Sequence, residues 1–174
     1  MNSTPHEHIV KSYDEDQRRI VEDVVRMGQA AVAQLEAALD VVERRDDSAA
    51  RRIVANDESI DESERRISHD VMLLALRGPM ARDLREILAG LRIPADLERI
   101  GDYAANVAKR SIALNTSPPL PHVAGLRALG LLAAGQVRQA LRAYREGDAE
   151  LALQVRENDA RLDEQYTGLF RELL

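Results

Sequence analysis

The segment LREILAGLRIPADLERIGDYAANVAK, residues 84–109, decides how this chain of 174 residues folds. When it is placed on a helix at about 100° per residue, its apolar side chains form one stripe, and Glu98 and Asp102 continue that stripe. The apolar members are Leu84, Leu88, Leu91 and Ala95. Two carboxylates therefore stand where we expect the buried face of the helix to go on.

This placement is unfavourable unless the two charges are compensated. Like charges four residues apart repel by about 0.2–0.5 kcal/mol on an exposed helix. In an apolar interface the cost rises to about several kcal/mol, unless a proton or a cation neutralises the pair. The alternative is a solvated helix end with Arg99 and Lys109 as counter-charges, and this helix alone does not distinguish the two.

The composition indicates an all-α protein. Hydrophobic residues make up 45% of the chain and aromatic residues 3%, and Ala, Leu, Arg and Glu dominate, as in long packed helices. A net charge of −6 argues against nucleic-acid binding. The chain has no apolar run of about 18 residues and no signal-peptide pattern. It also has no cysteine, so we expect a cytoplasmic protein.

Helix start and stop signals divide the chain into five expected helices. These signals include the N-cap cluster Asp46-Asp47-Ser48 and the stop and cap Gly147-Asp148. The five helices cover residues 7–45, 48–77, 79–113, 122–145 and 148–174. The segment LNTSPPLP, residues 114–121, is expected to be a proline-rich linker, because proline interrupts helices.

The last two expected helices repeat the first two at a constant offset of 102 residues. Gly28 matches Gly130, and the segment NDESIDE at 56–62 matches NDARLDE at 158–164. The pattern predicts tandem three-helix bundles. Residues 1–113 form the first bundle, residues 114–121 the linker, and residues 122–174 two helices of an incomplete second bundle. We expect these two helices to expose an apolar face that another chain covers, through dimerisation or helix exchange.

The second expected helix carries its own acidic pair, Asp57 and Asp61, near its centre. In a three-helix bundle the second and third helices pack face to face, so this pair can meet Glu98 and Asp102. Four carboxylates without His or Cys make an oxygen-only site that suits hard cations such as Mg²⁺, Ca²⁺, Mn²⁺ or ferric iron. Two acidic pairs, one of them repeated, favour a cation site over a solvated face. We find no motif typical of a catalytic site.

Three motifs together resemble the PhoU family of bacterial phosphate-signalling proteins. They are DLERIGDYAANVAK at 96–109, Pro79-x-x-Arg82-Asp83-Leu84-Arg85, and the repeated NDxxxDE segments. The resemblance implies tandem three-helix bundles in which E(D)xxxD motifs hold a metal centre of iron, manganese, magnesium or zinc. The implied metal ligands are Asp57, Asp61, Glu98, Asp102, Asp159 and Asp163. The chain ends before the helix that would complete the second set.

The resemblance also implies a regulator rather than an enzyme. Such a protein acts at the inner membrane, through partners, between the ATPase subunit of the high-affinity phosphate ABC transporter and the phosphate-sensing histidine kinase. It keeps the phosphate-starvation response off when phosphate is plentiful. Two alternatives remain open at this point: a carboxylate-bridged metalloenzyme such as a phosphohydrolase, and a metal-free helical interaction module.

Overall fold

The computed structural model describes residues 5–77, 83–119 and 123–173, and for residues 5–11, 83, 172 and 173 only the backbone. This part of the chain contains six helices and no strand, so the all-α prediction is confirmed. The helices are α1 (Pro5–Arg44), α2 (Asp47–Asn56), α3 (Glu58–Ala75), α4 (Asp83–Leu114), α5 (Val123–Glu146) and α6 (Ala149–Leu173). The predicted helix start at residue 79 lies outside the described residues.

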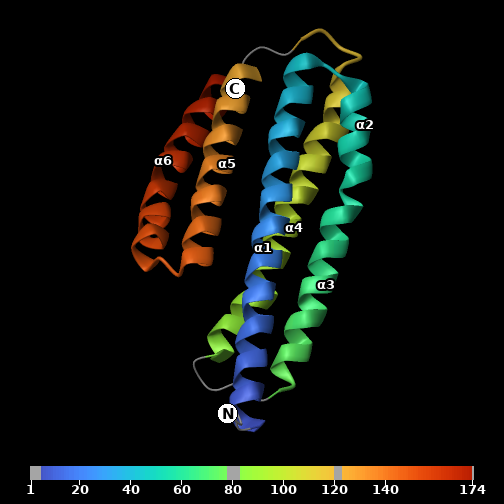
Figure 1. Cartoon of the computed structure of the whole chain (residues 1–174). Coiled ribbons are helices and arrows are strands. Elements are labelled where there is room, and N and C mark those ends of the chain that lie inside the picture. The colour runs from blue at the N-terminus through green and yellow to red at the C-terminus, as the bar shows by residue number, and fades with distance from the viewer. Residues whose placement is uncertain (1–4, 78–82, 120–122, 174) are drawn as a thin grey trace.

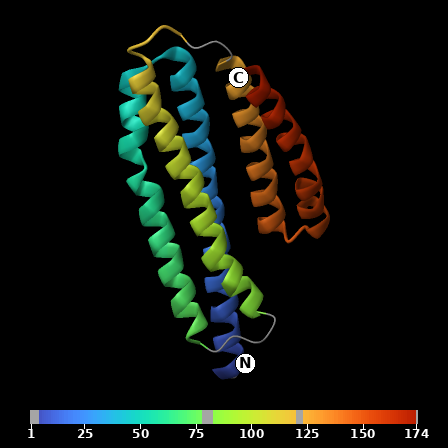
Figure 2. The same ribbon diagram turned by 180° about the vertical axis from the view of Figure 1, so that it is seen from behind.

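The six helices form one three-helix bundle and a two-helix extension (Figure 1). In the bundle, α2 and α3 follow one another along one side, and together with α1 and α4 they make three rods. Helix α5 packs antiparallel against α1, and α6 contacts α5 and no other described helix (Figure 2). The described residues therefore form one three-helix bundle followed by a two-helix unit, α5 and α6. The boundaries 1–113, 114–121 and 122–174 stay a prediction.

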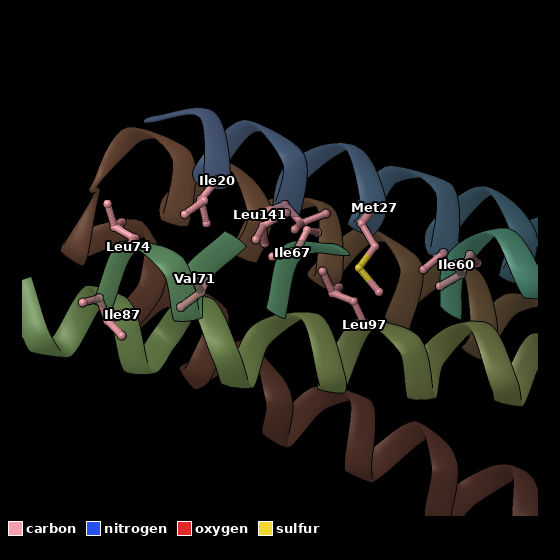
Figure 3. Close-up of a cluster of buried hydrophobic side chains, with 11 residues drawn as sticks. Ile20, Met27, Ile60, Ile67, Val71, Leu74, Ile87, Leu97 and Leu141 are labelled. Atoms are coloured by element: carbon pink, nitrogen blue, oxygen red, sulfur yellow. The ribbon is translucent and has the colours of Figure 1, made fainter. Parts of the chain in front are cut away.

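The core of the first bundle lies between α1, α3 and α4 (Figure 3). Met27 of α1 reaches toward Leu97 of α4, with Ile60 of α3 on the same side. The buried cluster comprises Ile20, Val24, Met27, Ala31, Ile60, Ile67, Val71, Leu74, Ile87, Leu97 and Leu141. Burial of an aliphatic side chain contributes about 1.5–3 kcal/mol, so this cluster fixes the register between α3 and α4.

The apolar stripe predicted for α4 is wrong. Leu84 and Leu88 are 51% and 52% exposed, and Ala95 is also exposed. The buried face instead runs through Ile87, Gly90, Pro94, Leu97, Gly101 and Ala104. The pattern of large apolar residues does not reveal this buried face, because part of it consists of glycines at which another helix packs closely. A Cβ on Gly90, for example, would lie 3.0 Å from Cγ2 of Val71. Glu98 and Asp102 follow Leu97 and Gly101 directly, so they lie at the edge of the buried face and not in its line.

The single helix predicted from residue 48 to 77 is two helices, which meet at Asp57. The hydroxyl of Ser59 donates to the carbonyl oxygen of Asn56 (2.7 Å), and the amide of Ile60 donates to the carbonyl oxygen of Asp57 (2.9 Å). The backbone bond of Ile60 spans three residues, and the amide of Asp61 donates to the same carbonyl oxygen at 3.3 Å, so a tighter turn is added at the junction. The interruption coincides with the first acidic residue of the NDxxxDE motif.

The internal repeat is visible in the backbone as well as in the sequence. The turn after α1 contains Arg45 with φ +56°, and the turn after α5 contains Gly147 with φ +65°. Asp46 and Asp148 follow them, and each accepts a hydrogen bond of 2.9 Å from the amide three residues later. The predicted helix caps are therefore present in both repeats.

Corresponding residues of the two repeats also meet where α1 packs on α5. A Cβ on Gly28 would lie 2.6 Å from Leu141, and one on Gly130 would lie 2.5 Å from Leu39. Since Gly28 corresponds to Gly130 and Leu39 to Leu141, each repeat places its leucine over the glycine of the other. The contact has approximate two-fold symmetry, and it joins α5 and α6 to the first bundle.

We predict that Gly28→Ala destabilises the protein by about 1–3 kcal/mol, because the added methyl group clashes with a leucine that is itself buried. Gly135→Ala is the matched control in α5, where a Cβ would meet nothing within 4 Å. Alanine should raise stability there by up to about 1 kcal/mol. Urea denaturation of both variants measures the difference. Equal stability of the two variants would contradict the close α1–α5 contact.

Candidate metal centre

Three of the predicted ligands come together beside the junction of α2 and α3. Asp57 lies at that junction, Asp61 lies one turn further in α3, and Asp102 faces them from α4. One carboxylate oxygen from each residue lies within 4.8 Å of the others. Among the described residues this is the one group of three or more potential metal ligands. Its oxygens are close enough together to coordinate a single ion.

Glu98 stands beside this group without belonging to it. It lies one turn before Asp102 on α4 and is half-buried. Burial raises the pKa of Glu98, and the negative charges of Asp102 and Asp61 raise it further. Glu98 therefore contributes negative charge to the site, while the closest oxygens belong to the three aspartates.

The pKa of Asp57 reflects both its burial and the carboxylates around it. Burial raises the pKa of Asp57, the hydrogen bond from Gln34 lowers it, and the neighbouring carboxylates of Asp102 and Asp61 raise it again. The net direction is upward, toward a carboxyl group that holds its proton more tightly than usual. A cation bound there would remove the repulsion that causes part of this shift.

Two further observations fit a cation. Oδ1 of Asp61 is buried and accepts no hydrogen bond from the described residues. Among those residues, no arginine or lysine forms an ion pair with Asp57, Asp61 or Asp102. Arg99, the expected counter-charge, lies 4.0 Å from Asp96 and donates to the hydroxyl of Tyr103. A buried oxygen among uncompensated carboxylates is suited to a hard metal ion.

Two residues of the site were not predicted as such from the sequence, Gln34 and Gly101. The side-chain amide of Gln34 on α1 donates to Oδ1 of Asp57 (2.6 Å) and to the carbonyl oxygen of Gly101 (3.2 Å). A Cβ on Gly101 would lie 3.3 Å from Oδ1 of Asp57 and 3.0 Å from Cδ1 of Ile60. Gly101 thus lets α3 approach α4 closely. The match of Gln34 with Gln136 in the repeat was the available signal.

The second predicted set of ligands is not assembled among the described residues. Asp159 and Asp163 are both exposed on α6, and no third acidic group joins them there. Gln136 donates to the carbonyl oxygen of Asn158 (3.0 Å), which places this amide beside the second motif as well. The two aspartates stay predicted ligands.

Comparison with known proteins places the chain in a family. The family model described as PhoU domain matches residues 24–111 and 126–174 of the chain. The chain belongs to the PhoU family.

Its PhoU relatives match it over nearly its whole length. A protein of Xylella fastidiosa (strain 9a5c), named phosphate-specific transport system accessory protein PhoU homolog, is 72% identical over all of this chain and 74% of its own length. A Caulobacter vibrioides (strain NA1000 / CB15N) protein of the same name is 38% identical over 97% of this chain and 74% of its own. The crystal structure of PhoU from Pseudomonas aeruginosa superposes with a TM-score of 0.86. The two sequences are 31% identical, and the superposition covers 92% of this chain and 78% of the Pseudomonas aeruginosa chain.

The names of these relatives describe accessory proteins of a transport system and not enzymes. Among the described helices of the chain, none combines the length and the apolar character that a membrane span requires.

The raised pKa values predict how stability depends on pH when no cation is bound. A raised pKa in the folded state means that the folded chain binds protons more tightly than the unfolded chain. This contribution to stability is present at low pH and is lost as the pH rises through the raised pKa values of Asp57 and Glu98, whose ordinary values are 3.8 and 4.5. Asp57→Asn/Glu98→Gln should therefore gain stability relative to the wild type as the pH rises from about 4 to about 7.

Urea denaturation in EDTA at several pH values measures this gain. Asp159→Asn/Asp163→Asn is the control, because it removes two exposed charges from α6. A difference between Asp57→Asn/Glu98→Gln and the wild type that stays constant with pH would contradict the electrostatic description of the site.

Proposed function

We propose that this PhoU-family chain is a metal-binding regulatory adaptor of phosphate uptake and signalling. The observation that carries the metal part is the group of Asp57, Asp61 and Asp102, with oxygens within 4.8 Å of one another and a buried, unpartnered oxygen on Asp61. The regulatory part is supported by the relatives, which are named accessory proteins of a phosphate-specific transport system.

In this proposal the three aspartates hold a hard metal ion, with Glu98 next to them. The donors are all oxygens, which favours magnesium, manganese or iron over zinc, since zinc more often takes nitrogen and sulfur ligands. When bound, the ion supplies positive charge between α3 and α4. The apolar core holds the two helices together, and we assign the aspartates no catalytic role. Asp159 and Asp163 are proposed as ligands of a second set on α6.

The proposed partners are those implied by the family resemblance. They are the ATPase subunit of the phosphate ABC transporter and the phosphate-sensing histidine kinase, which the protein couples so that the phosphate-starvation response stays off. Through them it lies on the cytoplasmic side of the inner membrane. A second copy of the chain is the proposed cover for the apolar side chains exposed on α5 and α6. These are Leu126, Leu153, Tyr166 and Phe170.

The metal part predicts that Asp57→Asn/Asp61→Asn lowers the metal content of the purified protein by the amount bound between α3 and α4, because two of the three closest ligands lose their charge. Asp159→Asn/Asp163→Asn changes the corresponding residues of the repeat and is the matched control, which should keep the metal bound to the first bundle. Elemental analysis after dialysis measures both. Equal metal content in wild type and Asp57→Asn/Asp61→Asn would support the metal-free interaction module instead.

The regulatory part predicts that deletion of the gene switches on phosphate-starvation genes in phosphate-rich medium. Reintroduction of the wild-type gene should restore repression, whereas Asp57→Asn/Asp61→Asn should restore it incompletely. Transcript levels of these genes measure the effect. Expression that is unchanged by the deletion would rule out this regulatory role.

A further inference from the structure

Gln34 lies on α1, away from both acidic motifs, yet its side chain ends at the aspartate group. The residue is 7% exposed. Its amide nitrogen donates to Oδ1 of Asp57 at 2.6 Å, a short bond of the kind formed with a charged acceptor. The same nitrogen donates to the carbonyl oxygen of Gly101 at 3.2 Å. One amide therefore joins α1, the α2–α3 junction and α4.

This bond limits how the carboxylate of Asp57 can turn. Asp57 lies at the junction of α2 and α3, where its carboxylate makes no capping hydrogen bond to the backbone. The Gln34 amide fixes Oδ1 from one side, and the backbone of Gly101 lies close on another. A carboxylate held by a neutral donor keeps its full negative charge for a cation, which a lysine or arginine partner would partly cancel.

The internal repeat points to the same role by an independent route. Gln136, at the position of Gln34 in the second repeat, also places its amide on the NDxxxDE segment, where it bonds to the carbonyl oxygen of Asn158 (3.0 Å). Both repeats therefore pair a glutamine of the first helix with the acidic motif of the next. In the second repeat no third acid joins Asp159 and Asp163 among the described residues, and the amide bonds to the backbone.

We infer that Gln34 is a positioning residue of the proposed metal centre. It orients the carboxylate of Asp57 relative to Asp61 and Asp102, so that the three oxygens are placed for a cation before the cation arrives. Groups that orient metal ligands in this way typically change metal affinity by about 10–100-fold when they are removed. This inference rests on the proposed function.

The test is isothermal titration of the full chain with Mn²⁺ at 25 °C. Gln34→Met keeps the length of the side chain and removes its donor, so its Kd should rise by about 10–100-fold. Gln29→Met makes the same change at an exposed position of α1 and should bind as the wild type does. Val32→Ala opens space in the core of the same helix, at a residue 1% exposed, and should also leave the Kd unchanged. Circular dichroism checks that each variant is folded.

Each remaining outcome supports or overturns the inference. If Gln34→Met does not fold, Gln34→Asn replaces it, because that amide is one methylene too short to reach Asp57 and should weaken binding likewise. A wild-type Kd in the folded Gln34 variant overturns the inference. An equal loss of affinity in Val32→Ala also overturns it, because packing and not the donor would then be responsible. The proposed metal centre survives these two results provided that Asp57→Asn/Asp61→Asn still loses Mn²⁺. Wild-type binding by that double variant overturns both.

Discussion

The mutual repulsion of Asp57, Asp61 and Asp102 is the constraint on which the description of this site depends. Their oxygens lie within 4.8 Å of one another, and the apolar packing of Ile60 and Leu97 on either side holds α3 against α4 despite this repulsion. Such an arrangement costs free energy unless a proton or a cation is present. The aspartate group therefore favours the binding of a positive charge, and this preference relates the fold to the proposed function.

Helix α1 connects this site to the rest of the molecule. On one side its Gln34 contacts the aspartate group, and on another its Gly28 packs against Leu141 of α5. The second contact is reciprocated by Leu39 over Gly130, so the two repeats are joined through equivalent surfaces. Ion pairs support the same interface, for example Arg127 with Asp40 at 2.9 Å. Among the described helices, α1 is the one that contacts α3, α4 and α5.

The sequence predicted those features that depend on local chemistry, and it failed where the outcome depends on a neighbouring helix. Helix caps at Asp46 and Asp148 follow from short-range hydrogen bonding, and the repeat follows from matched residues in register. The exposed positions of Leu84 and Leu88 were mispredicted, because the close contacts of α4 are made by glycines that carry no apolar signal. The contact of Gln34 with Asp57 was not predicted either, because the match with Gln136 shows a repeat but no contact, and a polar residue in a long helix is ordinarily solvated.

Anomalous diffraction from crystals grown with Mn²⁺ shows directly whether the three aspartates bind one ion, because it locates the ion without reference to activity or affinity. We expect an anomalous peak between α3 and α4, within coordination distance of carboxylate oxygens of Asp57, Asp61 and Asp102. A well-ordered structure with these side chains turned apart and no peak among them would contradict this expectation.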